Sequence, residues 1–388
     1  MIPIIIITGL ILIYLVIEAI SHRYYLSKIP IRIHVNGTRG KSSVTRLIAA
    51  GLRQGGMVTC GKTTGTLPRF ICPDGTERSI YRPSRPNILE QISTIKTAAR
   101  YAPKVIVIEC MAVQPLLQSL CELKLIRSTH GVITNVRADH LDVMGPDESD
   151  VALALAGTVP VGGRLYTTEK KHLNILKKVV SDRNSILVSV ENNVHDDMLS
   201  KFCYTEHKEN IAVALQVCED LGVSREIALT GMWEAPPDAG ALTQHVIGSS
   251  LFFNAFAAND PVSTGQLWHE LIQRNPIYTR RIALINCRHD RKQRSQQFAQ
   301  TCQQWEPADQ YIVIGTGTSA FIRTAEASGI DRRFIVDASD WDIENIMTTL
   351  INTGPSLIVG MGNIMGAGFE LLAYIKNIDC EAEKEKYD

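Results

Sequence analysis

One short glycine-rich segment constrains the fold of this chain more than any other feature. The residues NGTRGKSS occupy positions 36–43, between a predicted strand at 31–35 and an amphipathic run at 41–54. A strand, a tight turn and a helix in this order let successive backbone N–H groups and the helix N-terminus face a phosphate. The segment therefore predicts a P-loop within an α/β fold.

The loop has the short form G-x-x-G-K-S, because the strict spacing would need a glycine where the chain has Val35. In a P-loop the lysine, here Lys41, reaches the β- and γ-phosphates, and the hydroxyl of Ser42 holds Mg²⁺. An ordinary glycine turn beside a surface lysine is the alternative, which the strand–loop–helix order disfavours. We expect the whole loop to bind a nucleotide, through Asn36, Gly37, Thr38, Arg39, Gly40, Lys41, Ser42 and Ser43.

Alternating strand and helix patterns continue along the chain and predict a largely parallel sheet covered on both faces. Helices are expected at 41–54 and 209–221, and strands at 31–35, 105–108, 131–134, 282–285, 311–314, 334–336 and 357–359. The segment PPDAG at 236–240 interrupts the pattern. For 388 residues, at roughly 100–200 residues per domain, we expect a P-loop ATPase domain at 30–237 and a Rossmann-like domain at 241–380.

The N-terminal segment is apolar enough to cross a membrane. Its first seventeen residues carry no charged side chain, and a helix extended to residue 20 is about 30 Å long, the thickness of a bilayer core. Basic residues follow, so the positive-inside rule places the catalytic part in the cytoplasm. We expect a single-pass anchor of the cell membrane at 1–20. The alternatives are a buried core helix and a cleaved signal peptide, which would need a basic start and a cleavage motif.

The charge balance and the cysteine pattern argue against several other classes of protein. Lys and Arg total 40, as do Asp and Glu, whereas a general nucleic-acid binder normally has a basic surplus. We therefore expect no nucleic-acid partner. The nine cysteines are scattered without a C-x-x-C pair, which argues against a disulfide scaffold or a zinc module and favours buried, reduced thiols.

Two polar segments follow later strands, at the edge where an open α/β sheet binds its ligands. Glu109 comes directly after 105–108, where a carboxylate is costly unless it meets a cation. The segment ITNVRADHLD at 133–142 brings Asp139, His140 and Asp142 after another strand. Each of these groups has an alternative role in a loop cap or a solvated face. Together with the phosphate loop, they favour a nucleotide–metal site.

The loop at 37–43, Glu109 and the segment at 134–142 resemble the central ATPase domain of the Mur ligases and folylpolyglutamate synthetases. Those enzymes phosphorylate a carboxylate with ATP and let an amine attack the acyl phosphate. The chain is similar in particular to the ligase subunits of poly-γ-glutamate synthases, in length, in its N-terminal helix and in the segments at 61–66, 82–86 and 286–291. The resemblance implies a Mur-ligase-like fold and an ATP-dependent amide ligase that polymerises glutamate.

The resemblance also implies roles at the reaction centre. Lys41 would act on the phosphates of ATP, and Ser42 and Glu109 would hold one Mg²⁺. His140 would hold a second metal. Many Mur-type ligases support that metal with a lysine carbamate about fifteen residues further on, where this chain has Leu155. We therefore expect a second metal that is weak without nucleotide, and activity that does not respond to bicarbonate.

Two asparagines are implied near the nucleotide. Asn210 matches the first asparagine of a family element beside the adenine, although Glu209 and Val213 replace two other polar residues of that element. Asn259 aligns loosely with a loop that brings the second domain onto ATP. The adenine contacts are therefore predicted less firmly than the phosphate contacts.

A polyanionic product needs cationic groups, and the arginine fork suits carboxylates. Candidates for holding glutamate and poly-γ-glutamate are Arg82, Arg85, Arg288, His289 and Arg291, with solvated surface arginines as the alternative. A single anchor cannot form a route for a polyanion across a bilayer. We therefore expect small integral-membrane partner subunits of a synthase and export complex; association of identical copies stays open.

A second glycine-rich segment suggests a different chemistry. The residues GTGTSA at 315–320 follow a predicted strand, and Asp337 lies at the end of another, which is the outline of a dinucleotide fingerprint. A tight turn in a substrate-handling domain would need the same glycines. Two other functions stay open: an NAD-dependent enzyme, and a membrane-tethered P-loop ATPase that powers or regulates export without making amide bonds.

Overall fold

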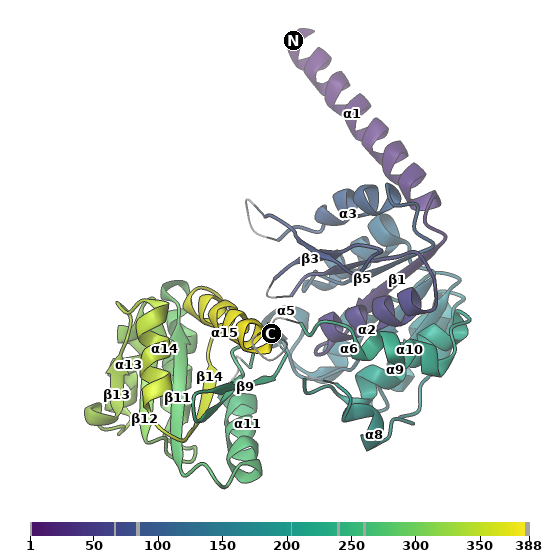
Figure 1. The fold of residues 1–388 in the computed structure, drawn as a ribbon. Coiled ribbons are helices and arrows are strands. Elements are labelled where there is room, and N and C mark those ends of the chain that lie inside the picture. Colours follow the sequence, from purple (N-terminus) through teal and green to yellow (C-terminus); the bar gives the residue numbers. More distant parts are fainter. Residues whose placement is uncertain are drawn as a thin grey trace. The chain divides into compact units, whose positions relative to one another are not determined.

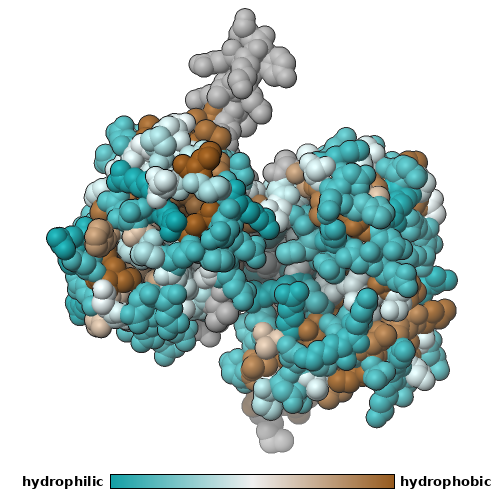
Figure 2. Space-filling view, turned by 90° about the horizontal axis from the view of Figure 1, so that it is seen from below, coloured by the Kyte–Doolittle hydropathy of each residue, from teal (hydrophilic) through white to brown (hydrophobic). Residues whose placement is uncertain are grey.

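The computed structural model describes residues 2–65, 67–82, 86–202, 204–238, 241–258 and 261–384. The chain forms two compact units, Met1–Asp238 and Ala239–Asp388 (Figure 1). Each unit has its own sheet and its own hydrophobic core. The face drawn in Figure 2 is mainly hydrophilic and is interrupted by small hydrophobic areas.

The first unit is built on an eight-stranded sheet. Its strands, in chain order, are β1 (Ile31–Asn36), β2 (Thr59–Thr63), β3 (Arg69–Ile71), β4 (Glu77–Ser79), β5 (Val105–Glu109), β6 (His130–Ile133), β7 (Arg164–Thr167) and β8 (Ile186–Ser189). The spatial order is β4-β3-β2-β5-β1-β6-β7-β8. Only β3 and β4, at one edge, run antiparallel to their neighbours. The central strands β5 and β1 are therefore covered on both faces, which explains the unbroken apolar run in β5.

Helices cover both faces of this sheet. One face carries α2 (Lys41–Gln54), α9 (Lys208–Asp220) and α10 (Arg225–Trp233); the other carries α3 (Glu90–Ala99), α4 (Pro115–Leu120), a π-helical turn at Cys121–Ile126, α6 (Glu148–Ala156) and α7 (Leu173–Asp182). Two short helices, α5 (Leu141–Met144) and α8 (Asp196–Leu199), lie in loops. Ile106 and Ile108 of β5 pack with Ile95 of α3 in one core cluster. The helix α2 and the strands β1, β5 and β6 confirm the predicted elements within one or two residues.

The N-terminal helix α1 (Ile2–Ser27) continues seven residues beyond the predicted end at residue 20. Its apolar side chains from Ile2 to Ile20 are largely exposed. Among the described residues, α1 is the one helix long and apolar enough to cross a membrane. Its last turns pack on the first unit, because His22 and Leu26 are buried and the ring of His22 hydrogen-bonds the carbonyl of Leu125 through Nε2 at 2.8 Å.

The second unit has a six-stranded sheet in the order β13-β12-β11-β14-β10-β9. The strands are β9 (Thr243–Ile247), β10 (Ser250–Asn254), β11 (Arg280–Cys287), β12 (Gln310–Gly315), β13 (Ile335–Asp337) and β14 (Ser356–Met361), and only β9 is antiparallel. The helices are α11 (Pro261–Arg274), α12 (Lys292–Cys302), α13 (Thr318–Ala327), α14 (Ile343–Asn352) and α15 (Ala367–Lys384), with two single 3-10 turns at His289–Arg291 and Arg332–Phe334. Trp268, Phe298 and Phe321 form the core on one face of the sheet, and Leu350 and Leu371 that on the other. Sheet and helices form a Rossmann-like unit.

Candidate active site

The phosphate loop connects β1 to α2 at the carboxyl edge of the first sheet. Gly37 and Gly40 have φ angles of +135° and +80°, which only glycine adopts at low cost. A Cβ on Gly37 would lie 2.0 Å from Oγ1 of Thr134, so the loop packs directly on the residue that follows β6. Gly40 is the N-cap of α2 and provides no side-chain cap. The first N–H groups of α2 are therefore left for a ligand.

Lys41 lies over the loop that precedes it. Its Nζ donates to the carbonyl of Gly37 at 2.7 Å and to that of Thr38 at 3.1 Å. An ammonium group has three donors, so one remains for a phosphate oxygen while two hold the lysine in place. This arrangement positions a cation at the mouth of the loop.

Glu109 lies beside the loop, at the end of the neighbouring strand β5. It is 2% exposed, and its Oε2 accepts hydrogen bonds from the hydroxyl of Ser42 at 2.9 Å and from the backbone N–H of Thr64 at 2.7 Å. Burial raises the pKa of Glu109, although the charge of Lys41 opposes this shift. Burial therefore disfavours the ionised carboxylate, and a bound cation would offset this cost.

The donor set around Glu109 fits a divalent metal. A carboxylate and a serine hydroxyl are hard oxygen ligands, and Mg²⁺ binds through one or two such groups together with phosphates and water. Ser42 and Glu109 already touch, so one cation could contact both oxygens with little rearrangement. The structure thus brings these two predicted metal ligands together.

The third predicted metal ligand is His140, which the sequence assigned to a second metal. It has a positive φ of +47° at the start of α5, its side chain is 55% exposed, and Nε2 lies 4.0 Å from Oδ1 of Asp139. Over the described ranges, no three His, Cys, Asp or Glu side chains gather closely enough to hold a metal. A site that includes His140 would need the nucleotide to supply the remaining ligands.

Two residues after β6 fix the loop from the other side; they lie in the polar segment at 133–142, but no individual role was predicted for them. Thr134 donates through Oγ1 to the carbonyl of Arg39 at 2.6 Å. Asn135 accepts at Oδ1 from the hydroxyl of Thr38 at 2.6 Å and from the N–H of Arg39 at 3.1 Å. Their position directly after a buried strand, next to the predicted loop, was the available signal. Thr134 and Asn135 therefore act as a clamp on the phosphate loop.

Asn210, on α9, supports the same loop. It is buried, and its Nδ2 donates to Oε1 of Glu206 at 2.8 Å. A Cβ on Gly40 would lie 2.6 Å from Oδ1 of Asn210, so the asparagine packs directly under the turn. Burial also raises the pKa of Glu206. Asn259 and Arg85 lie outside the described residues.

A buried arginine completes the surroundings of the first site and was not predicted. Arg46, on α2, is 5% exposed and forms an ion pair with Glu77. Its Nε lies 3.5 Å from Oδ1 of Asp238. Burial lowers the pKa of Arg46, while the charges of Asp238 and Glu109 act in the opposite direction. Arg46 therefore supplies a fixed positive charge one helical turn behind Ser42.

The predicted substrate-binding arginines that the structure describes belong to both units. Arg82, in the first unit, pairs with Glu90 through Nε at 2.6 Å, and Lys62 also contacts Glu90 at 2.6 Å. In the second unit, Arg288 and His289 line a pocket of about 350 Å³ at the carboxyl edge of the sheet. Arg288 makes a two-pronged contact with Asp290, and Arg291 is exposed beside it.

The second glycine-rich loop closes on its own unit. Gly315 has a φ of +85°, and a Cβ there would lie 2.3 Å from Oδ1 of Asn286. The same asparagine donates from Nδ2 to the carbonyls of Asn363 and Met365, at 2.5 Å and 2.9 Å. The tight turn is thus explained by packing around Asn286, without a dinucleotide.

Comparisons with known proteins agree with this arrangement. Residues 35–234 match the family model of the Mur ligase middle domain, and residues 243–378 match that of the poly-gamma-glutamate synthase CapB C-terminal domain. The chain is 37% identical to the capsule biosynthesis protein CapB of Bacillus anthracis, over 95% of this chain and 81% of the relative. It is 35% identical to the PGA synthase CapB of Bacillus subtilis (strain 168), over 95% of each chain.

The fold is also found among solved structures. The bifunctional folylpolyglutamate synthase/dihydrofolate synthase of Yersinia pestis, complexed with AMPPNP and a Mn ion, has a TM-score of 0.68 at 15% identity, over 92% of each chain. The predicted Mur-ligase-like α/β fold is therefore confirmed.

Fold and site together define an ATP-dependent amide ligase of the Mur ligase type. Within that class, the chain belongs to the CapB family of poly-γ-glutamate synthases. This assignment confirms the resemblance that the loop, Glu109 and the segment at 134–142 indicated.

Proposed function

We propose that this protein polymerises glutamate into poly-γ-glutamate through an acyl-phosphate intermediate, with ATP and Mg²⁺. The observation that carries the proposal is the contact between Ser42 and the buried Glu109 beside Lys41, at the mouth of a phosphate loop. Two relatives are named for capsule biosynthesis and PGA synthesis. One solved structure with the same fold, a bifunctional folylpolyglutamate synthase/dihydrofolate synthase, has Mn, AMPPNP and L-glutamate bound.

The proposed chemistry solves the problem of an unreactive carboxylate. A γ-carboxylate oxygen attacks the γ-phosphorus of ATP, the bond to the β-phosphate oxygen breaks, and ADP leaves. The amine of a second glutamate then attacks the acyl carbon, phosphate leaves with the former carboxylate oxygen, and an amide forms. Phosphoryl transfer needs positioning and charge neutralisation, which the loop and Lys41 supply.

The residues of the first unit divide this work. Lys41 neutralises the transferred phosphoryl group, and the loop N–H groups hold the phosphates. Ser42 and Glu109 would hold Mg²⁺, which would supply charge neutralisation at the γ-phosphate. We assign His140 to a second metal whose remaining ligands are phosphate oxygens and water, and Asn210 and Asn259 to the nucleotide.

We assign the glutamate and the growing polymer to the arginines. In the second unit, Arg288 and His289 line the pocket at the carboxyl edge, and Arg291 lines a smaller neighbouring pocket together with Arg288. Arg291 is exposed and is the residue best able to meet an incoming carboxylate. Arg82 forms an ion pair with Glu90. To bind substrate, Arg82 would have to leave the carboxylate of Glu90 and pair with a carboxylate of the substrate. Arg85 belongs to the same proposal through sequence alone.

We place the protein at the cell membrane, with α1 as a single-pass anchor and both units in the cytoplasm. The exposed apolar surface of α1 from Ile2 to Ile20 needs a hydrocarbon environment. One helix cannot carry a polyanion across a bilayer. Small integral-membrane subunits are therefore the proposed partners for export.

The experiment is a coupled assay on the full chain in detergent micelles with ATP, Mg²⁺ and glutamate. We expect one phosphate released per amide bond formed, with polymer detected by mass. Lys41→Ala is expected to lose about 10³-fold in rate while keeping its far-UV circular dichroism. Phosphate release that is independent of glutamate and yields no amide would instead identify a P-loop ATPase that energises export, and would overturn the ligase proposal.

A further inference from the structure

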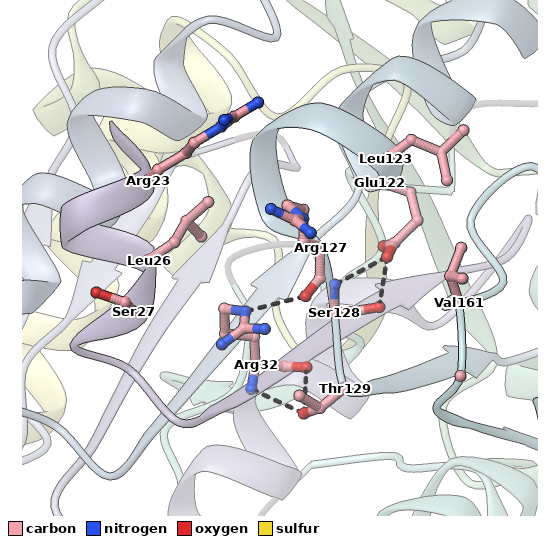
Figure 3. Close-up of a pocket in the computed structure, with 11 residues that line it drawn as sticks. Arg23, Leu26, Ser27, Arg32, Glu122, Leu123, Arg127, Ser128, Thr129 and Val161 are labelled. Atoms are coloured by element: carbon pink, nitrogen blue, oxygen red, sulfur yellow. Dashed lines mark hydrogen bonds between the residues drawn. The ribbon is translucent and has the colours of Figure 1, made fainter. Parts of the chain in front are cut away.

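A second pocket lies on the first unit, where α1 meets the sheet (Figure 3). It has a volume of about 530 Å³ and is lined by three arginines: Arg23 from the end of α1, Arg32 from the start of β1, and Arg127 from the loop before β6. Leu123 and Val161 supply exposed apolar surface at its rim. We call this the basal pocket.

The basal pocket is separate from the nucleotide site. Arg32 is the second residue of β1, whereas the phosphate loop begins where β1 ends. Parallel strands place these two features at opposite edges of the sheet, about 16 Å apart for five residues of strand. The loop before β6, which carries Arg127, lies at that same amino edge. The mechanism proposed above uses none of these residues.

The pocket carries an excess of positive charge. Among the described residues, neither Arg23 nor Arg127 forms an ion pair, and Arg32 donates only to backbone carbonyls, those of Ile29, Ile126 and Arg127. Burial and the neighbouring Arg127 lower the pKa of Arg32. An anion in the pocket would stabilise the charged guanidinium of Arg32 against both its burial and the repulsion from Arg127.

One carboxylate, that of Glu122, lines the pocket but is already engaged. Its Oε2 lies 2.8 Å from Nδ1 of His34. Its Oε1 accepts from the N–H and the hydroxyl of Ser128, at 2.8 Å and 2.9 Å. Figure 3 shows this carboxylate turned toward Ser128, while Arg32 and Arg127 lie between Ser128 and α1. The charge of Glu122 acts on Arg32 and raises its pKa, but this carboxylate forms no ion pair with the guanidinium groups, so three arginines face a single engaged carboxylate in the pocket.

The position along α1 indicates where the anion comes from. The last large exposed apolar residue of the helix is Ile20, apart from Tyr24, and Arg23 lies three residues further, about 4.5 Å along the axis. The polar headgroup layer occupies roughly 5–8 Å on each side of the hydrocarbon core. Tyr24 is 55% exposed, and Lys28 sits over its ring at 4.5 Å, a pair typical of the membrane interface. The basal pocket is therefore at headgroup depth.

We propose that the basal pocket binds the phosphate group of an anionic phospholipid from the cytoplasmic leaflet, with Arg23, Arg32 and Arg127 as its cationic partners. The inference rests on the membrane anchoring proposed above, but not on the ligase reaction. The bound lipid would fix the orientation of the first unit at the bilayer, since the site joins α1 to two strands of the sheet.

The test counts lipids bound to the full chain in detergent micelles by native mass spectrometry, with phosphatidylglycerol and phosphatidylcholine as probes. The variant is Arg23→Gln/Arg127→Asn, in which asparagine suits the positive φ of +49° at position 127. Arg32 is kept, because its hydrogen bonds hold the backbone. The control is Lys178→Gln/Arg323→Gln, which removes the same charge from exposed sites on α7 and α13.

We expect the wild type and the control to retain phosphatidylglycerol in preference to phosphatidylcholine, and the pocket variant to bind it about thirtyfold more weakly. Equal retention by the pocket variant, with circular dichroism unchanged, would overturn the proposal. If the double variant does not fold, Arg23→Gln alone is expected to give about fivefold weaker binding, and unchanged binding in that variant would have the same consequence.

Two further probes identify the source of the anion. Glycerol phosphate that displaces the lipid at equal concentration would assign the pocket to a free phosphate ester and contradict the lipid proposal. Poly-γ-glutamate that displaces the lipid more effectively than glycerol phosphate does would assign the pocket to the polymer, and would also contradict the lipid proposal. Because the readout is bound mass rather than turnover, an inactive ligase that still retains lipid would leave this inference intact.

Discussion

The packing of Gly40 on Asn210 makes the phosphate loop sensitive to a single methyl group. At φ +80° an alanine costs roughly 1–2 kcal/mol in backbone strain. Its Cβ would also lie 2.6 Å from Oδ1 and 2.9 Å from Nδ2 of Asn210. The asparagine is buried and can move only by breaking its bond to Glu206, which costs about 1–3 kcal/mol. Gly40→Ala is therefore expected to lower the free energy of unfolding by about 2–5 kcal/mol.

A matched control separates strain from packing. Gly222 has a similar φ of +88°, but a Cβ there meets nothing within 4 Å. Gly222→Ala should cost only the strain, about 1–2 kcal/mol, and should keep full activity. In Gly40→Ala the loop is displaced as well, and a shift of about 1 Å in a catalytic group commonly costs on the order of 100-fold in rate.

Urea unfolding and ATP turnover with glutamate measure both quantities. The double variant Gly40→Ala/Asn210→Ala removes the atoms that clash. Its loss in free energy of unfolding should therefore be smaller than the sum of the losses in the two single variants, by about 1 kcal/mol or more. If Gly40→Ala is no less stable than Gly222→Ala and turns over ATP at the wild-type rate, the placement of Asn210 beneath the loop is wrong.

Four further predictions concern the metal, the substrate and the second metal site. Burial raises the pKa of Glu109 in the folded protein, so the unfolded chain loses this proton at a lower pH. The metal-free wild type should therefore lose stability relative to Glu109→Gln as the pH rises above 4.5. Parallel stability curves of the two proteins from pH 4 to pH 8 would contradict this. Glu109→Gln should also lose at least about 100-fold in ATP turnover. Arg291→Gln should lower kcat/KM for glutamate about tenfold through loss of a charge-assisted bond, whereas Arg323→Gln, on the exposed side of α13, should not change it; equal effects would remove Arg291 from the substrate site. Depletion of carbon dioxide and bicarbonate should leave the rate unchanged, because Leu155 is buried in an apolar core cluster where a carbamate cannot form; a reversible loss of rate would point to another lysine, with Lys170 as the nearest.

The parts of the fold that follow from local pattern were predictable. The strand, loop and helix around residues 31–54 have apolar spacing and glycine positions that allow one arrangement, and α2 begins and ends where expected. Strand β2 was missed because its sequence TCGKT has no apolar run, although all five residues are buried. Its buried Lys62 is stabilised by Glu90, a partner 28 residues away that no local pattern reveals.

The site shows the same division. The contact of Ser42 with Glu109 follows from topology, because adjacent parallel strands end at one edge of the sheet. The positions of His140 and Arg82 do not follow, since they depend on loop conformation and on contacts with Asp139 and Glu90. The roles of Thr134 and Asn135 as a clamp required the three-dimensional packing of the loop on β6.

The acyl phosphate is the central claim, and isotope transfer tests it most directly. Glutamate labelled with ¹⁸O in its γ-carboxylate would be incubated with the full chain, ATP and Mg²⁺, and the released phosphate analysed by mass. Because the carboxylate oxygen that attacks the γ-phosphorus leaves with the phosphate, the account predicts one ¹⁸O atom transferred to phosphate for each amide bond formed. Polymer formation with unlabelled phosphate would contradict the account.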